Sequence, residues 1–391
     1  MMKGSIKLGR WAGVQVSASW STAIIAALIT WTLGGVLLPS AVSDIHPITA
    51  WSFGVVGALL FFASLLAHEL GHAVTARSAG IRTEEVTLWM FGGVAKLTAE
   101  ARTPRDEMRI AAAGPAVSIG LAVGFFAAAN LASVASAPTV IVVLATWMAL
   151  MNVSLGVFNL LPGLPLDGGR ILKAWRWQRT GDEYGAVRTA ATGGKVVGGL
   201  LLGAGFFGFA SGGSGLWTAL IGFFIWQSAK AEEFAARVKQ IMSALTVGQV
   251  TDAEVPVVPS HTTLDELAQR VMPRSGRGAV VLHDSSDRIV GVIDVNRMGT
   301  VHPSAWPLTP AHQVAWPAAH PEGAPLAHPN QALIDLTGGS GYHLVYADGK
   351  FMGLVTPEAV SRRVLSGTMA RRTESTASFE NRATPREGHR E

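Results

Sequence analysis

The chain has 391 residues, of which 49% are hydrophobic and 15% are charged, and its mean hydropathy is +0.33. A typical soluble domain carries about 25% charged residues, so this composition excludes an ordinary soluble protein. The formal net charge is only +4 and no basic stripe is interleaved with aromatic residues, which excludes nucleic acid as a partner. The chain contains no cysteine, so disulfides and thiolate metal sites are excluded as well.

The apolar residues are unevenly distributed, and the changes in composition predict four parts. Residues 1–230 are apolar and rich in Gly and Ala, which predicts a transmembrane domain. Residues 231–245 carry apolar side chains at helical spacing, which predicts an amphipathic linker helix. Residues 246–366 have the composition of a soluble domain, and residues 367–391 have that of a disordered tail.

Six segments of the first part are apolar enough to cross a membrane, although the last two are short for a bilayer that needs about 20 residues. Lys and Arg occur before the first segment and after the second, fourth and sixth, and they are absent from the other three connections. By the positive-inside rule, this alternation predicts a multi-pass protein of the cell membrane with both termini in the cytoplasm. The predicted spans are roughly residues 19–38, 50–72, 110–130, 139–160, 196–211 and 215–229.

The second span ends in the sequence HELGH, residues 68–72, which places ionisable side chains where they are costly. His68 follows Ala50, where the apolar run begins, by a helical rise of about 27 Å, so it lies just inside the cytoplasmic face of the bilayer. His68 and His72 are four residues apart and project from one face of a helix, with Glu69 beside them. This spacing suits two nitrogen ligands of one zinc ion and a glutamate that polarises a water molecule. The alternatives are a structural hydrogen-bond cluster and a proton relay.

A catalytic zinc site needs a third protein ligand, and the sequence FNLLPGLPLDGGR, residues 158–170, offers one. The fourth predicted span ends here after a rise of about 30 Å from Thr139, so Asp167 lies at about the same depth as His68. Pro162 and Pro165 break the helix, which a membrane tolerates only beside protein or a wet cavity. Alone, these residues would indicate a plain turn; beside two histidines at matching depth, they predict a metal ligand.

Residues 85–98, EVTLWMFGGVAKLT, alternate in polarity and are rich in β-forming residues. The pattern predicts a membrane-associated β-hairpin with its turn at Gly92 and Gly93. Such a hairpin would offer an edge strand to an extended substrate segment, because a helical peptide must be unwound before its carbonyl can be attacked. The alternative is an amphipathic re-entrant loop that seals the bundle.

These motifs together resemble the site-2 protease family of zinc intramembrane metalloproteases. The resemblance rests on HELGH, FGG at residues 91–93, AGP at residues 113–115 and NLLPGLPLDGG at residues 159–169, in the family's order. It implies one zinc ion per chain bound by His68, His72 and Asp167, with Glu69 as the general base. It also implies that Asn159 lies near the scissile carbonyl and that residues Phe91, Gly92 and Gly93 contact the substrate. The implied substrates are membrane-anchored proteins, cut within transmembrane segments in regulated intramembrane proteolysis.

Residues 247–298 and 341–364 share a pattern of strands followed by a helix, which resembles a pair of cystathionine-β-synthase-type (CBS) modules. In such modules a Thr or Ser and a later Asp contact the ribose of an adenosyl nucleotide. Thr356 matches this pattern, whereas Asp294 stands at the first Thr position and Arg297 and Ala359 stand at the acid positions. The pair therefore predicts a regulatory domain that forms a homodimer, and nucleotide binding is left open.

The complete prediction is a polytopic α-helical membrane protein of about six transmembrane helices with a membrane-associated β-hairpin, followed by a cytoplasmic α+β CBS-like pair. Two alternative functions remain open. A CBS-regulated transporter of divalent metals would need a site near the bilayer centre with acids on several spans, and here two spans supply ligands at the cytoplasmic edge. An inactive protease-like scaffold is disfavoured because Glu69 is intact.

Overall fold

The computed structural model describes residues 5–90, 92–213, 215–276, 278–320, 323–336 and 340–366. Phe91 and the predicted disordered tail, residues 367–391, lie outside the described residues. The chain divides into two compact units, Met1–Phe234 and Ala235–Glu391, and each is described by itself.

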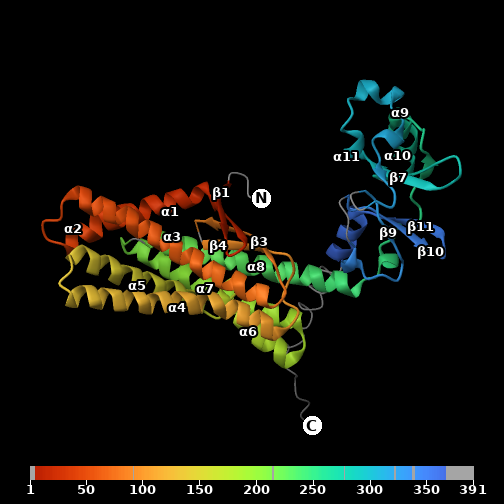
Figure 1. The fold of residues 1–391 in the computed structure, drawn as a ribbon. Helices are drawn as coiled ribbons and strands as arrows, with labels where there is room; N and C mark the ends of the chain where they lie inside the picture. The colour runs from red at the N-terminus through yellow and green to blue at the C-terminus, as the bar shows by residue number, and fades with distance from the viewer. Residues whose placement is uncertain are drawn as a thin grey trace, which may run out of the picture. The chain divides into compact units, whose positions relative to one another are not determined.

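The first unit is built from long, apolar helices that run side by side (Figure 1). Five helical segments in the described part of the chain are long and apolar enough to cross a membrane, and the multi-pass prediction is confirmed. The sixth predicted segment, residues 215–229, forms the first half of a longer helix that is not among these five. The helices are α1 Trp20–Trp31, which continues through a π-helical stretch Thr32–Leu37 into α2 Leu38–Ala41, then α3 Pro47–Ser78, α4 Pro104–Val134, α5 Thr139–Asn159, α6 Asp167–Thr180, α7 Glu183–Ala210 and α8 Leu216–Ala244.

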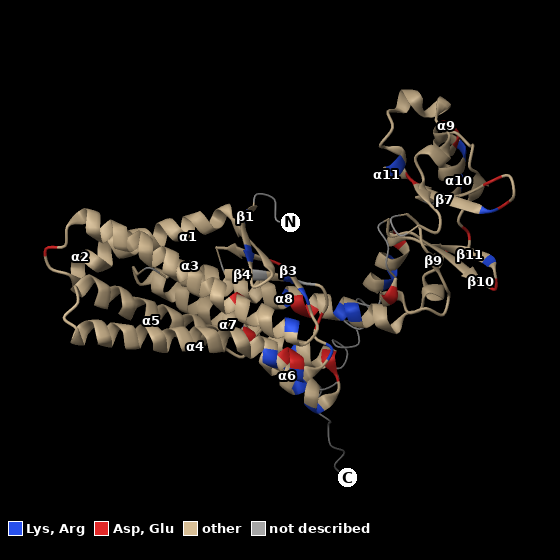
Figure 2. Ribbon diagram, in the orientation of Figure 1, with Lys and Arg blue, Asp and Glu red and all other residues tan. Residues whose placement is uncertain are grey.

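The surface of this helical bundle is apolar, as lipid contact requires. Leu59, Val123 and Phe126 are more than 60% exposed, and at most 33% of any spanning segment is buried inside the protein. Small residues allow close helix packing inside the bundle, as at Gly54 of α3, where a Cβ atom would lie 2.8 Å from the carbonyl oxygen of Thr30. Figure 2 shows that charged residues are sparse along α3, α4 and α5 and gather around α6.

A four-stranded sheet lies beside the C-terminal half of α3. Its strands are ordered β1-β2-β3-β4, with β2 and β3 parallel and the other neighbours antiparallel. The predicted hairpin is therefore present, but as half of a larger sheet that the sequence analysis missed. The strands β1 and β2 form the other half. Two features of the sequence could have indicated them: the alternation of polarity in residues 14–19 and the turn-forming pair Ala12-Gly13. The strands are β1 Ser5–Trp11, β2 Val14–Ser19, β3 Thr83–Trp89 and β4 Gly92–Leu97.

The predicted turn of this hairpin is wrong by two residues. Trp89 pairs with Gly92 and Leu88 pairs with Gly93, so the turn lies between Trp89 and Gly92, and both glycines belong to β4. Gly92 adopts a φ of +136°, which residues with a side chain rarely reach. Its backbone conformation, and not a turn, is the reason for a glycine at this position.

The second unit is an α+β structure whose halves share one strand topology. In each half a short strand pairs in parallel with the first strand of an antiparallel hairpin, and a helix follows the hairpin. The two halves are joined by a buried hydrogen bond of 2.8 Å from the Tyr342 hydroxyl to Asp294 Oδ2. The elements are β5 Val257–Pro259, α9 Leu264–Glu266, α10 Met272–Ser275, β6 Ala279–His283, β7 Ile289–Asp294, α11 Val295–Met298, β8 Trp316–Pro317, β9 Leu326–Ala327, β10 His343–Ala347, β11 Lys350–Val355 and a helix over residues 357–366.

Candidate metal centre

The two histidines of α3 are held by hydrogen bonds to their outer ring nitrogens. His68 Nδ1 lies 2.8 Å from Ser118 Oγ, and His72 Nδ1 lies 2.7 Å from the carbonyl oxygen of Ile110, both on α4. His68 and His72 are 2% and 9% exposed. With Nδ1 engaged on both rings, the two Nε2 atoms face the same point and are 3.2 Å apart. Histidines that bind a metal through one ring nitrogen commonly hydrogen-bond through the other in this way.

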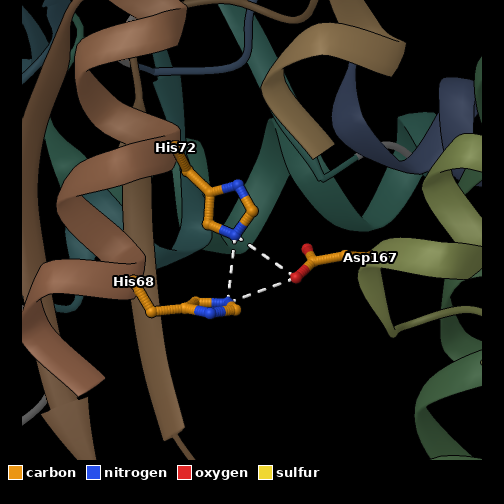
Figure 3. Close-up of side chains that lie close together, drawn as sticks. All are labelled: His68, His72 and Asp167. Carbon is orange, nitrogen blue, oxygen red and sulfur yellow. Dashed lines mark hydrogen bonds and ion pairs between the residues drawn. The ribbon is translucent and has the colours of Figure 1, made fainter. Parts of the chain in front are cut away.

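Asp167 completes a triangle of ligand atoms with these nitrogens (Figure 3). Its Oδ2 atom lies 3.2 Å from His68 Nε2 and 3.3 Å from His72 Nε2. Asp167 is 8% exposed, and Oδ2 receives no hydrogen bond of good geometry from the described residues. The sequence-based expectation that Asp167 lies level with His68 agrees with these distances.

The triangle fits a zinc ion by both size and chemistry. Two atoms that each lie about 2.0–2.1 Å from a tetrahedral zinc ion are about 3.3–3.4 Å apart. The three distances between the Nε2 and Oδ2 atoms are close to this value. His72 Nδ1 must donate its proton to the Ile110 carbonyl, so in the neutral ring the Nε2 lone pair points toward the carboxylate and the other ring. Lone pairs and a carboxylate that converge on one point repel each other unless a cation lies between them.

Gly114 of α4 provides the space for this centre. A Cβ atom at Gly114 would contact His72 Nε2 and would lie 2.7 Å from His68 Nε2. The helix backbone therefore forms one wall of the site, and only a residue without a side chain fits there. Gly114 is the middle residue of the AGP motif, and its role could not be read from the sequence because the motif does not show which face of α4 it occupies.

A tightly packed loop places Asp167 at the first position of α6. The loop follows α5, and the Leu164 amide donates a 3.0 Å hydrogen bond to the carbonyl oxygen of Ala190 on α7. Gly163 packs against the backbone of Gly194 so closely that neither position has space for a side chain. Gly163 is therefore required by contact with α7, which lies far away in the sequence, whereas Gly168 and Gly169 are required by close contact with the backbone of residues 160–164.

A buried carboxylate links α6 to α4 next to the site. Glu107 of α4 is 6% exposed, and its Oε1 lies 3.4 Å from Arg170 Nε and 3.5 Å from Lys173 Nζ, both on α6. Arg170 follows Asp167 by one helical turn, so these ion pairs fix the helix that carries Asp167. Sequence reasoning missed Glu107, because an acid in the first turn of a helix is common without any tertiary partner.

Strand β4 runs directly beside Glu69. A Cβ atom at Gly93 would contact the Glu69 side chain and would lie 2.5 Å from its carboxyl carbon. Strand β4 is also an edge of the sheet in the order β1-β2-β3-β4. A peptide that paired with this edge would therefore be bound next to the glutamate.

Asn159 does not join the three ligands in this structure. Its Nδ2 donates a 3.0 Å hydrogen bond to the carbonyl oxygen of Leu155 in its own helix. A second amide, Asn152, is 1% exposed in the same helix and donates to Ser64 Oγ at 3.3 Å. Ser64 precedes His68 by one turn of α3, so this pair packs α5 against the metal-binding helix. The sequence analysis did not single out Asn152.

Comparisons with known proteins agree with this geometry. Residues 56–139 and 129–202 match the model of peptidase family M50. The protein Rip3 of Mycobacterium tuberculosis, named as a zinc metalloprotease, is 37% identical over 371 residues, which cover 93% of each chain. The chain belongs to peptidase family M50. The predicted resemblance to site-2 proteases, the class of zinc metalloprotease and the zinc cofactor are thereby confirmed.

Two solved structures are also similar to parts of the chain. The site-2 protease from Methanocaldococcus jannaschii is 27% identical, with a TM-score of 0.42, and the match covers 59% of this chain and 95% of that one. The CBS domain of a bacterial Mg²⁺ transporter of the CNNM/CorC family is 17% identical, with a TM-score of 0.28, and the match covers 34% of this chain and 82% of that one.

Proposed function

We propose that this M50 metalloprotease hydrolyses peptide bonds within transmembrane segments of membrane-anchored proteins, close to the cytoplasmic face. The observation that carries the proposal is the buried triangle of His68 Nε2, His72 Nε2 and Asp167 Oδ2 on and beside a membrane-spanning helix. An extended apolar substrate segment could reach such a site from the bilayer. This placement favours intramembrane cleavage over hydrolysis of soluble peptides.

His68, His72 and Asp167 are proposed as the ligands of one zinc ion, with the fourth position left for water or substrate. Bound there, zinc would polarise the substrate carbonyl and increase the acidity of water. Glu69 follows His68 directly and lies beside the β4 edge. We assign it the transfer of a proton from the attacking water to the departing amine.

Strand β4 is proposed to hold the substrate in an extended form. Pairing with an edge strand satisfies the backbone groups of an unwound segment, which would otherwise be costly inside a membrane. The lack of a side chain at Gly92 and Gly93 lets the peptide approach Glu69, and Phe91 belongs to the same proposed contact. Asn159 is assigned as a donor to the scissile carbonyl oxygen, which requires Nδ2 to leave its partner on Leu155.

The decisive experiment compares Glu69→Gln with the wild type on a membrane-anchored reporter substrate. Glu69→Gln should retain one zinc per chain and lose about 10²-fold or more in cleavage rate, as expected for loss of a general base. Glu84→Gln, at an exposed carboxylate of β3, serves as the matched control and should cleave normally. His72→Ala should lose zinc and cleavage together. Near wild-type cleavage by Glu69→Gln would refute the assigned role.

The proposed orientation places both termini in the cytoplasm. It rests on the absence of Lys and Arg from the connections 39–49, 131–138 and 212–214. Single cysteines at Ser43 and Ser136 should react with an impermeant reagent in intact cells, and one at Glu266 should not. Labelling at position 266 alone would reverse the orientation.

The second unit is proposed to act as a regulatory, dimer-forming domain. Thr356 and Ala359 line a cavity of about 560 Å³, and the Thr356 hydroxyl accepts a hydrogen bond from the Ala359 amide at 3.1 Å. Arg297 is engaged elsewhere, because its Nε donates to the Val314 carbonyl at 2.6 Å and its guanidinium lies 4.3 Å from the centre of the Trp316 ring. We therefore expect an adenosyl nucleotide to bind in the cavity at Thr356.

Two measurements test this regulatory role. The mass of the detergent-solubilised protein should correspond to two chains. Addition of adenosine monophosphate should change the thermal unfolding of the wild type more than that of Thr356→Val. A monomeric protein whose cleavage rate and stability do not change with the nucleotide would contradict both the dimer and the regulatory role.

A further inference from the structure

We propose that a basic pocket beside the end of α3 binds the phosphate of an anionic lipid headgroup. The pocket has a volume of about 470 Å³ and lies between the β1–β2 turn, the last turns of α3 and the start of β3. Arg77 and Arg82 supply its charge, and Ala73 and Val74 supply an apolar wall. This basic pocket shares no residue with the metal centre, and the inference does not depend on the proposed proteolysis.

The charge of the basic pocket is not neutralised by the protein. No Asp or Glu lines it, and within the described ranges neither Arg77 nor Arg82 has a side-chain hydrogen bond or ion pair. The nearest acids in the sequence are engaged elsewhere. Glu84 lies 2.6 Å from Lys96 Nζ, and Glu85 accepts a 2.6 Å hydrogen bond from the Ser17 hydroxyl. Two guanidinium groups without an acidic partner suit an anion with several acceptor oxygens.

The basic pocket lies at the depth of lipid headgroups. Arg77 follows Ala50 by 27 positions of α3, which corresponds to a rise of about 40 Å. The hydrocarbon layer is about 30 Å thick and the headgroups add about 5–8 Å on each side, so the Arg77 backbone lies just beyond the headgroup layer. Its side chain leans toward the N-terminus of the helix and so reaches back to the headgroups. Val74, one turn earlier at a rise of about 36 Å, is 55% exposed and offers an apolar surface within the headgroup layer. A charged pocket with an apolar lower wall at this depth matches a phospholipid.

The alternative occupants fit less well. The cytoplasmic flanks of membrane proteins are enriched in Lys and Arg, so a substrate flank would be repelled by two arginines. Free phosphate would use the charge but not the apolar wall of Ala73 and Val74. An anionic lipid uses both, and the membrane supplies it at high local concentration.

The shape of the basic pocket depends on a glycine at the β1–β2 turn. Gly13 has a φ of +83°, and a Cβ atom there would lie 3.2 Å from Arg77 Nη1. The turn therefore lies directly over the guanidinium group. A lipid phosphate bound to Arg77 and Arg82 would tie α3 to the start of β3, and α3 is the helix that carries His68 and His72.

The test uses the full-length protein in mild detergent and native mass spectrometry with phosphatidylglycerol. The double variant Arg77→Gln/Arg82→Gln should retain at least five-fold less lipid than the wild type. Arg102→Gln/Arg105→Gln removes two exposed arginines that do not line the basic pocket, and it should retain lipid normally. Arg77→Lys/Arg82→Lys keeps the charge and should restore most of the binding, which separates charge loss from misfolding.

Each other outcome has a defined meaning. Equal phosphatidylglycerol retention by the two glutamine double variants would overturn the proposal. Retention of phosphatidylcholine as strongly as phosphatidylglycerol would show that charge is not recognised, and would overturn it too. Thermal stabilisation of the wild type by inorganic phosphate, with none by phosphatidylglycerol, would identify free phosphate as the ligand in place of lipid.

Discussion

Replacing Gly114 by alanine should abolish zinc binding while leaving the helix intact. The new methyl group would lie 2.6 Å from His72 Cε1 and 2.7 Å from His68 Nε2, in the space that the metal centre requires. Ordinary contacts of a Cβ atom begin at 3.4 Å. The rings, or α4 itself, must therefore retreat by at least about 0.7 Å, whereas zinc–ligand distances tolerate only about 0.2 Å.

The expected loss of zinc affinity follows from this mismatch. Disturbing the groups that merely orient zinc ligands costs about 10–100-fold in affinity. Gly114→Ala displaces two ligand rings directly, so we expect at least about 100-fold, which corresponds to about 2.7 kcal/mol. His68 and His72 also have hydrogen-bond partners on α4, so movement of the helix would not restore the site.

The assay is competition for zinc against a chelator of known affinity, with circular dichroism as the check on folding. Gly120→Ala is the matched control, because it lies on the same helix and a Cβ atom there meets nothing within 4 Å. An exposed Gly→Ala exchange within a helix should stabilise it by up to about 1 kcal/mol and leave zinc binding unchanged. If Gly114→Ala bound zinc as tightly as Gly120→Ala, the fit of the metal centre described above would be refuted.

Three further predictions concern the surroundings of the metal centre. Gly93→Ala should push the Glu69 carboxyl group aside, so cleavage of a membrane-anchored reporter should fall about 10²-fold while the zinc content measured by atomic absorption stays at one per chain. Glu107→Gln should leave Arg170 without its carboxylate partner and Lys173 with Glu183 alone, 3.7 Å away. The free energy of unfolding should fall by about 1–3 kcal/mol, measured by denaturation in detergent, and an unchanged midpoint would show that the pairs contribute nothing. Removing zinc with a chelator should lower the thermal midpoint of the wild type, because the metal binds the folded form alone, and no shift would count against a ligand set assembled by folding.

Part of the site could be predicted because helix geometry is fixed. The four-residue spacing of His68 and His72 places both rings on one helix face wherever the helix lies. The constant rise of 1.5 Å per residue likewise brings Asp167 to the depth of His68 from a different span. Both inferences need only local geometry and the thickness of the bilayer. They concern ionisable residues, which have few other roles in an apolar environment.

The residues that the sequence analysis missed act through contacts between distant segments. Gly114 and Gly120 are both glycines within α4, yet a Cβ atom at Gly114 would meet the two histidine rings and one at Gly120 would meet nothing within 4 Å. Glu107 begins a helix as many acids do, and its partners on α6 follow it by more than 60 residues. The same limit explains the misplaced hairpin turn. A Gly-Gly pair favours a tight turn, but here close approach to Glu69 explains Gly93 instead.

The third ligand belongs to a different helix from the other two, and this has a mechanical consequence. His68 and His72 are fixed on α3 and bonded to α4, whereas Asp167 begins α6, which Glu107 ties to α4. A zinc ion bound by all three residues would therefore stabilise the packing of α6 against α3 and α4. The same loop reaches α7 through the Leu164–Ala190 hydrogen bond. Metal binding and packing of four helices are therefore coupled, and a weakened contact at any of them should first appear as a faster loss of zinc.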